Sequence, residues 1–472
     1  MGDFMSKGVF GLIVANRGFF PAELARDGRK NLINILKENG YESVVLSEED
    51  SKFGSVETFK DAQKCAELFK KNADKIDGII VSHPNFGEEK GILETIRLSH
   101  LDVPILIQAE PDDTNKMAIQ YRRDSFCGKI SDCNNLRQAG IPFSLTKNHT
   151  VSVSSKEFID ELDRFSRVCK IVKGLKYVRL GAIGARPSAF NTVRYSEKIL
   201  ENYNVAVQTV DLSEILYNAN RLSDDNSLVK EKLSQIKNYF KVCSIDDSKL
   251  IKMGKFGVII DEWAKDNEIN AVAIQCWTSL EENYGIVPCT IMSMLSESLI
   301  PSACEVDVTG VLSMYVLQLA TSKPSAIMDW NNNYGSDLDK CVLFHCSNIA
   351  KSFLENAEMK YQQIIAGTVG KDNTFGTVEG KIKPVRSTFL RLTTDDVNGC
   401  IRGYVGDGEF TDDPLDTFGG YGVYKINNLQ NLMQFLCEYG FEHHVAINIG
   451  QVSDAISEAL DKYVGWDIYQ HL

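Results

Sequence analysis

The sequence predicts an α/β protein in which two doubly wound (Rossmann-like) domains precede a β-rich, barrel-like domain. Three observations predict this class. Short β-branched runs alternate with amphipathic helical runs through the first third of the chain, and the alternation returns near Val178. After about residue 355 the composition shifts toward Gly, Thr and β-branched residues, which favours antiparallel sheet. The length of 472 residues leaves room for about three domains.

The first expected domain, residues 1–170, contains a helix over Ala22–Asn39 that ends at Gly40 and a second helix over about Val56–Asn72. Strands and helices that alternate at this spacing indicate a parallel sheet, because parallel neighbours need a crossover connection. Four strands are expected: Val9–Val14, Ser43–Leu46, Gly78–Val81 and Ile105–Gln108.

The second expected domain, residues 171–354, begins after a helix that carries Phe158 and Leu162. A helix is expected over Asn191–Glu201, and the stretch 213–267 is helical and charged. Three strands repeat the buried, β-branched pattern of the first domain: Arg179–Ile183, Val205–Val210 and Ala271–Gln275.

The third expected domain, residues 355–472, is rich in β-forming residues over Thr368–Thr388 and Thr388–Val405. Both stretches indicate antiparallel, barrel-like strands. A closing helix is expected over Val452–Tyr463. Turns are expected at three glycines: Gly370, Gly380 and Gly399.

Composition excludes several classes of function. The net charge of −13 argues against a nucleic-acid partner, because phosphate contacts need clustered Lys and Arg. No apolar run approaches the roughly 18–20 residues that span a bilayer, and the N-terminus lacks the apolar stretch of a signal peptide. The twelve cysteines are scattered and form no C-x-x-C pair, so the spacing offers no framework for a thiolate zinc site. We therefore expect a cytoplasmic protein with reduced thiols and no membrane partner.

Two predicted strands end in glycine-containing segments that carry an arginine. These segments, Ala15–Gly18 and Gly181–Pro187, match neither G-x-G-x-x-G nor a Walker A loop, so a dinucleotide cradle is not expected. Both lie at the carboxyl ends of predicted strands, where open α/β sheets bind ligands. Arg17 and Arg186 are thus candidates to bind anions or hydroxyl groups, with a role as surface arginines as the alternative.

Two carboxylates stand in apolar surroundings. Glu305 follows the small-residue pair Ala303-Cys304, and Asp329 ends the apolar run that begins at Ala326. A buried charge is costly unless it is paired or binds a metal. Asn331 lies just beyond Asp329 and adds a polar side chain. Each acid also has an alternative role as a helix cap or a solvated loop residue.

Three histidines have informative neighbours. His345 lies within the apolar strand expected over Val342–Cys346, whereas His443 and His444 open the strand Val445–Ile449. Alternation along a strand predicts that only one of this adjacent pair faces an interior site. A buried, hydrogen-bonded histidine is the alternative for each.

Two carboxylates and an imidazole with open coordination positions suit Mn²⁺, with Mg²⁺ or Co²⁺ also compatible. Such a cation would act as a Lewis acid toward a carbonyl oxygen. This chemistry fits proton abstraction next to a carbonyl and an enediol intermediate.

The chain resembles the L-fucose isomerase family, with L-arabinose isomerases as more distant relatives. Glu305 and Asp329 are 24 positions apart, which is the spacing of the metal carboxylates in that family. The resemblance covers most of the chain from about residue 175 and the N-terminal third more loosely. It rests on five stretches: Gly184–Thr192, Gln275–Trp277, Ser302–Asp307, Met328–Trp330 and Glu442–Ala446.

The resemblance implies that Glu305, Asp329 and His444 hold Mn²⁺, with His345 as a fourth ligand or a neighbouring partner. It also implies a three-domain subunit in a homo-oligomer, a hexamer or trimer, with active sites at subunit contacts. Arg17 would then reach the site of a neighbouring subunit. Five residues are expected to contact the substrate: Arg17, Arg186, Trp277, Asn331 and His443.

The implied reaction is aldose–ketose isomerisation of an open-chain sugar, with Glu305 and Asp329 moving the proton through a cis-enediol. The expected substrate is a 6-deoxy or 6-sulfo hexose (L-fucose-like or sulfoquinovose) or D-arabinose. A sugar-binding protein without catalysis and a metal-dependent carbohydrate hydrolase or lyase are the alternatives. A sulfonate would need cationic contacts, for which six arginines are candidates: Arg17, Arg26, Arg29, Arg122, Arg123 and Arg186.

Overall fold

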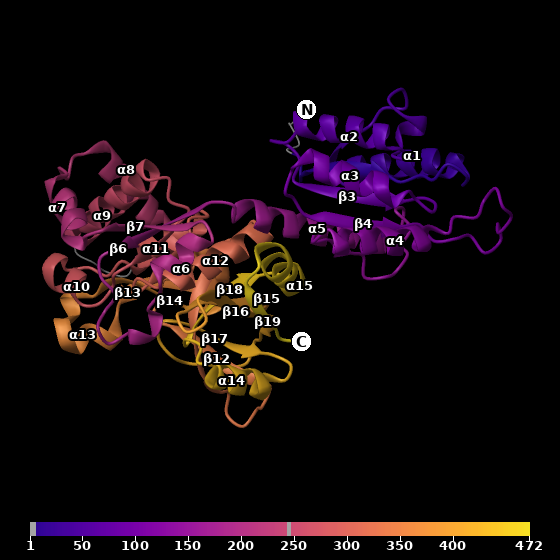
Figure 1. Cartoon of the computed structure of the whole chain (residues 1–472). Coiled ribbons are helices and arrows are strands. Elements are labelled where there is room, and N and C mark those ends of the chain that lie inside the picture. The colour runs from indigo at the N-terminus through magenta and orange to yellow at the C-terminus, as the bar shows by residue number, and fades with distance from the viewer. Residues whose placement is uncertain (1–5, 243–246) are drawn as a thin grey trace. The chain divides into compact units, whose positions relative to one another are not determined.

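The computed structural model describes residues 6–242 and 247–472, and within them the chain forms two compact units (Figure 1). One unit runs to Lys173 and includes the short segment Glu458–Gly465. The other holds Gly174–Ser457 and Trp466–Leu472.

The N-terminal unit is a doubly wound fold around a five-stranded parallel sheet of order β2-β1-β3-β4-β5. This order reverses direction between β1 and β3, as in flavodoxin-like sheets. The four longer strands match the predicted ones to within two residues at each end. The strands are β1 (Val9–Val14), β2 (Glu42–Val45), β3 (Gly78–His83), β4 (Ile105–Ala109) and β5 (Ser144–Leu145).

Five helices belong mainly to this unit, and in α1, α2 and α5 the buried face follows the helical period of the apolar residues. The helix α4 differs, because it buries the polar residues Lys129 and Asp132. Thr58 and Asp61 form a reciprocal capping box that begins α2. The helices are α1 (Ala22–Glu38), α2 (Phe59–Lys71), α3 (Glu89–Ser99), α4 (Ser125–Gln138) and α5 (Lys156–Gly174).

The helix expected over Val452–Tyr463 is divided between the two units. Its first part is α15 (Ser453–Ser457), and the following residues, Glu458–Val464, form a π-helical segment of the N-terminal unit. The Tyr463 hydroxyl lies 2.8 Å from that of Ser144 and donates to the carbonyl of Ile105. These contacts attach the segment Glu458–Val464 to β4 and β5 of the N-terminal unit.

The second unit contains a four-stranded parallel sheet of order β10-β9-β6-β7. Its strands are β6 (Val178–Ile183), β7 (Val205–Val210), β9 (Ala271–Ile274) and β10 (Ser302–Cys304). The helices that accompany it are α6 (Glu197–Asn202), α7 (Leu212–Arg221), α8 (Ser227–Tyr239), α9 (Asp247–Asp266), α10 (Ser279–Tyr284), α11 (Cys289–Glu297) and α12 (Val308–Thr321).

The helix expected over Asn191–Glu201 is wrong in its first half. Asn191–Val193 is a single 3₁₀ turn, and α6 begins only at Glu197. Ser196 has extended backbone angles, and its N–H donates to the Thr394 hydroxyl instead of to a preceding helical carbonyl. Because of this tertiary hydrogen bond, α6 begins after Ser196.

A ten-stranded mixed sheet of order β19-β16-β15-β18-β11-β12-β17-β14-β13-β8 completes this unit. An additional antiparallel pairing of β16 with β17 closes six of these strands into a ring. The predicted barrel-like domain is therefore confirmed. The ring strands are β11 (Ser325–Asn333), β12 (Lys340–His345), β15 (Val385–Asp395), β16 (Cys400–Phe410), β17 (Gly420–Lys425) and β18 (His444–Ile449).

The remaining elements extend or cover this sheet. Four strands lie outside the ring: β8 (Lys241–Val242), β13 (Leu354–Tyr361), β14 (Phe375–Ile382) and β19 (Asp467–Gln470). Besides α15, two helices accompany them: α13 (Gln363–Val369) and α14 (Leu429–Glu438). Aromatic side chains from β15, β16 and β17 meet in the barrel core: Phe389, Tyr404 and Tyr424.

Two ring strands, β11 and β12, precede residue 355, so the barrel draws on both the central and the C-terminal parts of the chain. This arrangement positions the site, because β11 pairs with β18 and sets Asp329 opposite His444. Among the described helices, none has both the length and the apolar character that a bilayer crossing requires.

Candidate metal centre and active site

Glu305 lies at the carboxyl end of β10, where the chain turns sharply into α12. Glu305 and Val306 both have positive φ, 63° and 54°, which is uncommon for residues with a side chain. Asp307 then caps α12, with its Oδ1 accepting from the Gly310 N–H at 2.8 Å. The turn leaves Glu305 only 3% exposed.

The imidazole of His444 lies close to the carboxylates of both Glu305 and Asp329. Its Nε2 lies 3.4 Å from Glu305 Oε2 and 3.4 Å from Asp329 Oδ1. Asp329 and His444 are direct partners in the antiparallel β11–β18 pair, so their side chains share one face of the sheet. The end of the parallel sheet and the barrel thus supply one cluster.

A buried chain of charges holds the His444 ring in place. Its Nδ1 donates to Asp307 Oδ2 at 2.8 Å, which leaves Nε2 directed at the other two carboxylates. The Arg391 guanidinium donates to both oxygens of Asp307, at 2.6 and 3.0 Å, and to Glu442 at 3.2 Å. Burial opposes ionisation, but the charge of Arg391 holds the pKa of Asp307 well below its usual range.

Glu305 and Asp329 have the chemistry that a divalent cation needs. Glu305 Oε2 and Asp329 Oδ1 are buried and accept no hydrogen bond from the described residues. Burial raises the pKa of Glu305 to about 7 and that of Asp329 to about 6. Buried carboxylate oxygens without donors are costly, and a cation would satisfy them. The residues therefore fit a divalent metal.

His345 and His443 border the same cluster. Ligand atoms of Asp329, His345 and His444 lie within 4.8 Å of one another, as do those of Glu305, His443 and His444. Burial lowers the pKa of His345 to about 3 and that of His443 to about 4. Both imidazoles are thus neutral near pH 7 and have a lone pair to offer.

The expectation that only one of His443 and His444 faces the site was wrong. His443 Nε2 lies 3.7 Å from Asp329 Oδ1, on the side where His444 also approaches. The physical reason is that β18 begins at His444, so strand alternation does not apply to His443. The His443 carbonyl instead accepts from the Trp330 N–H.

An aromatic group stands beside these histidines. The Phe190 ring centroid lies 5.6 Å from that of Trp277 and 6.3 Å from that of His443. Phe190 ends the loop that leaves β6, and Gln275 anchors this loop by accepting from the Ala185 N–H.

Arg186 lies on the same loop, half-buried, with Nη1 donating to the Pro187 carbonyl at 3.0 Å. Asn331 is exposed and lies two positions beyond Asp329 on β11, where the register with β12 shifts between Trp330 and Asn333. Of the substrate-contacting residues expected from sequence, the second unit therefore holds Arg186, Trp277, Asn331 and His443.

Arg17 lies in the N-terminal unit, just beyond β1. Its guanidinium stands over the Phe86 ring, donates to the Gly87 carbonyl and pairs with Glu88 and Glu89. Three other candidate arginines have carboxylate partners in that unit, and one donates to a carbonyl. The pairs are Arg26 with Glu23 and Asp27, Arg29 with Glu48, Arg122 with Asp124, and Arg123 with the Pro84 carbonyl.

Four functional residues were not singled out from the sequence: Asp307, Arg391, Glu442 and Phe190. A signal existed for Arg391, because a lone arginine between Leu390 and Leu392 in an apolar strand needs a buried partner. Its partner Asp307 is 84 positions away, which no local pattern reveals.

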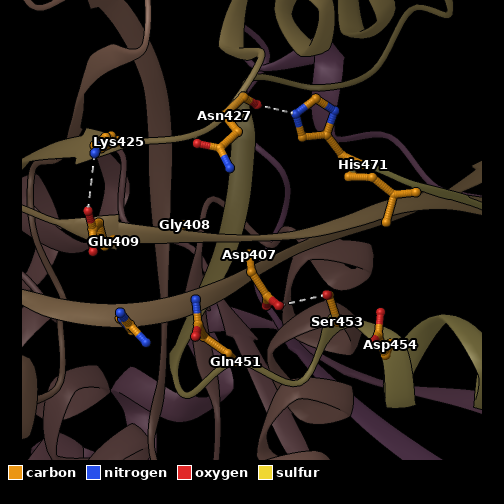
Figure 2. Close-up of a pocket in the computed structure, with 11 residues that line it drawn as sticks. Asp407, Gly408, Glu409, Lys425, Asn427, Gln451, Ser453, Asp454 and His471 are labelled. Atoms are coloured by element: carbon orange, nitrogen blue, oxygen red, sulfur yellow. Dashed lines mark hydrogen bonds and ion pairs between the residues drawn. The ribbon is translucent and has the colours of Figure 1, made fainter. Parts of the chain in front are cut away.

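A separate polar pocket of about 430 Å³ lies against the barrel and contains none of these residues (Figure 2). Many of its charged groups already have partners. Asp407 accepts from the Ser453 hydroxyl at 2.8 Å, and Lys425 lies 3.6 Å from Glu409. The chemistry expected from the sequence therefore belongs to the cluster around His444.

Comparison with known proteins gives the family of the chain. Residues 11–176 match the model of the fucose/sulfoquinovose isomerase N-terminal domain, and residues 343–471 match that of the L-fucose isomerase C-terminal domain. The chain belongs to the fucose isomerase-like family. The matched family comprises aldose–ketose isomerases, which are intramolecular oxidoreductases, so the predicted family and enzyme class are confirmed. A receptor without catalysis and a hydrolase or lyase are thereby set aside.

Several relatives align with this chain over most of its length. A sulfoquinovose isomerase of Priestia aryabhattai is 21% identical over 447 residues, 94% of each chain. One of Alkalicoccus urumqiensis is 24% identical over 81% of this chain and 83% of its own. One of Clostridium sp. (strain MSTE9) is 23% identical over 72% and 75%.

Proposed function

We propose that the protein is a divalent-metal-dependent aldose–ketose isomerase that acts on a 6-substituted hexose, with sulfoquinovose as the preferred substrate. The observation that carries this proposal is the convergence of Glu305, Asp329 and His444 around two buried carboxylate oxygens that lack donors. The names of the relatives support the choice of substrate.

The cation would be held by Glu305, Asp329 and His444, with His345 as a further ligand. A mixed oxygen and imidazole set favours Mn²⁺, with Mg²⁺ and Co²⁺ as alternatives. When bound, the cation supplies a Lewis acid that stabilises negative charge on a sugar oxygen.

Isomerisation moves a proton between C1 and C2, the two carbons that carry the reacting oxygens O1 and O2. One carboxylate takes the proton from C2 of the open-chain aldose while O1 gains a proton, which gives a cis-enediol. O2 then loses its proton as C1 receives one, which gives the ketose, and the other carboxylate assists this transfer between the oxygens. We assign the role of the base at C2 to the member of the Glu305/Asp329 pair that keeps one oxygen free of the cation. The pKa of a carboxylate oxygen that a bound cation holds is lowered, so the carboxylate that keeps a free oxygen is the better base.

Arg186 is the cation that we assign to the sulfonate on C6. It shares a loop with Phe190, whose ring contacts those of Trp277 and His443. The guanidinium makes no ion pair with a described residue, unlike Arg17, Arg26, Arg29 and Arg122. A planar guanidinium matches two sulfonate oxygens as it matches those of a carboxylate.

The variant Arg186→Met tests this assignment. We expect KM for sulfoquinovose to rise at least about 10-fold, the loss of one charge-assisted hydrogen-bonded pair. KM for a neutral analogue, 6-deoxyglucose, should change less than about 3-fold, since the variant removes only the partner of the sulfonate.

Arg194→Met is the matched control, because Arg194 lies nearby in the chain and donates only to the Asn191 carbonyl. An equal rise of KM for both sugars, or an equal effect of Arg194→Met, would remove Arg186 from sulfonate binding.

We further propose a cytoplasmic homo-oligomer, a trimer or hexamer, whose active sites lie at subunit contacts and receive Arg17 from a neighbour. The family resemblance supports this assembly. Light scattering of the full chain distinguishes these states from a monomer.

A further inference from the structure

Four buried cysteines from distant parts of the chain gather beside His345. Cys276 follows β9, Cys289 begins α11, Cys304 ends β10 and Cys346 follows β12. None is more than 9% exposed, and Cys346 is the most accessible of them. The sequence contains no C-x-x-C pair, so spacing alone did not reveal this group.

Three of the groups present ligand atoms to a common point. The Sγ atoms of Cys304 and Cys346 and a ring nitrogen of His345 all lie within 4.8 Å of one another. Cys346 Sγ is 3.9 Å from His345 Nδ1. The Cys276 thiol interacts with that of Cys304, which in turn interacts with Cys346. Cys289 lies at the margin of this group.

The donor set differs from that of the cluster around His444. Thiolates are soft ligands that select Zn²⁺, Cd²⁺ or Cu⁺ over Mg²⁺ and Mn²⁺. A tetrahedral zinc ion with bonds of about 2.3 Å to sulfur holds its sulfur atoms roughly 3.8 Å apart. Atoms already within 4.8 Å reach that geometry through small side-chain shifts.

We propose that Cys304, Cys346 and His345 Nδ1 form a second metal site, with the neighbouring Cys276 thiol completing it as a fourth ligand, and that this site takes a thiophilic divalent cation such as Zn²⁺ or Cd²⁺. The site stands apart from the oxygen-rich cluster in its donors but is linked to it. Cys304 immediately precedes Glu305, and His345 also borders Asp329 and His444. An ion held by Cys304 and His345 would therefore fix residues that the oxygen-rich site needs.

A regulatory consequence follows, and it rests on the proposed function. Zn²⁺ should inhibit the Mn²⁺-loaded enzyme, because a neutral imidazole offers one lone pair and His345 bound to Zn²⁺ through Nδ1 is lost as a ligand of the oxygen-rich site. Added Mn²⁺ should not restore activity. The variant Cys346→Ser should lose this inhibition, because it removes a ligand without touching Glu305, Asp329 or His444.

Cadmium titration of the full-length, reduced, metal-free protein tests the site without any activity measurement. Cd²⁺ bound to thiolates absorbs in the ultraviolet, and ¹¹³Cd resonances report sulfur donors. We expect the thiolate absorption to saturate at one equivalent of Cd²⁺ in the wild type. The same saturation is expected in Glu305→Gln, in which the oxygen-rich site is impaired. Cys346→Ser should weaken Cd²⁺ binding at least about 10-fold and reduce the thiolate absorption.

Cys437→Ser is the matched control, because Cys437 is an exposed thiol and should contribute nothing. The proposal is overturned if no thiolate absorption develops, if Cys346→Ser leaves it unchanged, or if Cys437→Ser removes it. Circular dichroism checks that each variant is folded. A Cys276→Ser variant, which removes another proposed ligand, should weaken binding as well. Failure of the sugar assay with an intact cadmium result would contradict the proposed function and leave this site standing.

Discussion

The His444 imidazole is oriented by charges that never reach the substrate. Asp307 holds Nδ1, and Arg391 and Glu442 complete a buried chain behind it. This fixes the tautomer with a lone pair on Nε2 once a cation replaces the proton there. His443 approaches Asp329, but no described residue orients its ring by a hydrogen bond, and its side chain is 39% exposed.

We therefore expect the two neighbouring histidines to differ in metal binding. His444→Ala should lower Mn²⁺ affinity more than about 100-fold, because it removes a ligand that is already oriented. His443→Ala should lower it less than about 10-fold. Calorimetric titration of the metal-free variants measures both. A larger loss in His443→Ala would assign the ligand to the wrong histidine.

Arg391 should matter more for stability than any exposed arginine. Removing one partner from a buried ion pair leaves an uncompensated charge, which typically costs about 3–5 kcal/mol. Arg391→Met leaves the buried carboxylates of Asp307 and Glu442 without the cation that compensates their charge. We expect urea unfolding to show a loss of this size.

Lys425→Met, on β17 of the same barrel, is the control. Lys425 pairs with Glu409, and the two side chains are 45% and 41% exposed, so its removal should cost about 1 kcal/mol or less. Equal losses in the two variants would show that the Arg391 network does not stabilise the fold as we infer.

At the scale of secondary-structure elements, α10 carries a buried carboxyl group outside the site. Glu281 is fully buried, and neither of its oxygens has a hydrogen-bond partner among the described residues. Burial raises the pKa of Glu281 from 4.5 to about 8. The folded protein therefore keeps this group protonated at neutral pH, whereas the unfolded chain releases the proton.

The consequence is a pH-dependent penalty on folding. Below about pH 4.5 both states are protonated and Glu281 has no linkage effect. The penalty grows as pH rises from there to about 8, reaching on the order of 3–5 kcal/mol. Glu281→Met should thus raise the free energy of unfolding at pH 7 more than at pH 4.5.

Denaturant unfolding at the two pH values measures this difference, and Glu282→Met, at an exposed neighbour, is the control. A gain that is equal at both pH values would mean that packing, not ionisation, sets the effect.

The elements also show what sequence patterns can and cannot predict. Strands such as β3 and β9 follow from apolar runs because every residue in them is buried. The start of α6 could not be predicted, since a hydrogen bond to Thr394, almost 200 positions away, sets it. The ring closure of β16 on β17 is likewise a tertiary event.

For the site, the family resemblance predicts Glu305, Asp329 and His444 as the ligands, and the structure brings these three side chains together. Sequence reasoning did not identify Arg391 or Glu442, because the contacts of Arg391 to Asp307 and to Glu442 join residues 84 and 51 positions apart. The orientation of His443 was also predicted wrongly. Alternation holds only within a strand, and the sequence does not show that β18 begins at His444, one residue after His443.

On the scale of the whole molecule, the second unit assembles its site from two sheets. The parallel sheet delivers Glu305 at the end of β10, and the barrel delivers Asp329 and His444 from paired strands. Neither sheet alone holds all three residues. The N-terminal unit has its own open sheet, with Arg17 just beyond β1.

The central claim is that this assembly isomerises a 6-substituted hexose with the help of a divalent cation. The most direct test is to supply sulfoquinovose to the metal-stripped full-length protein, with and without Mn²⁺, and to follow ketose formation by ¹³C NMR. L-Fucose, D-arabinose and D-glucose serve as competing substrates, and Glu305→Gln as the inactive control. We predict ketose from sulfoquinovose at a rate at least about 100-fold higher with Mn²⁺ than without. Unchanged sulfoquinovose in the presence of Mn²⁺, or equal conversion by the stripped protein, would contradict the account.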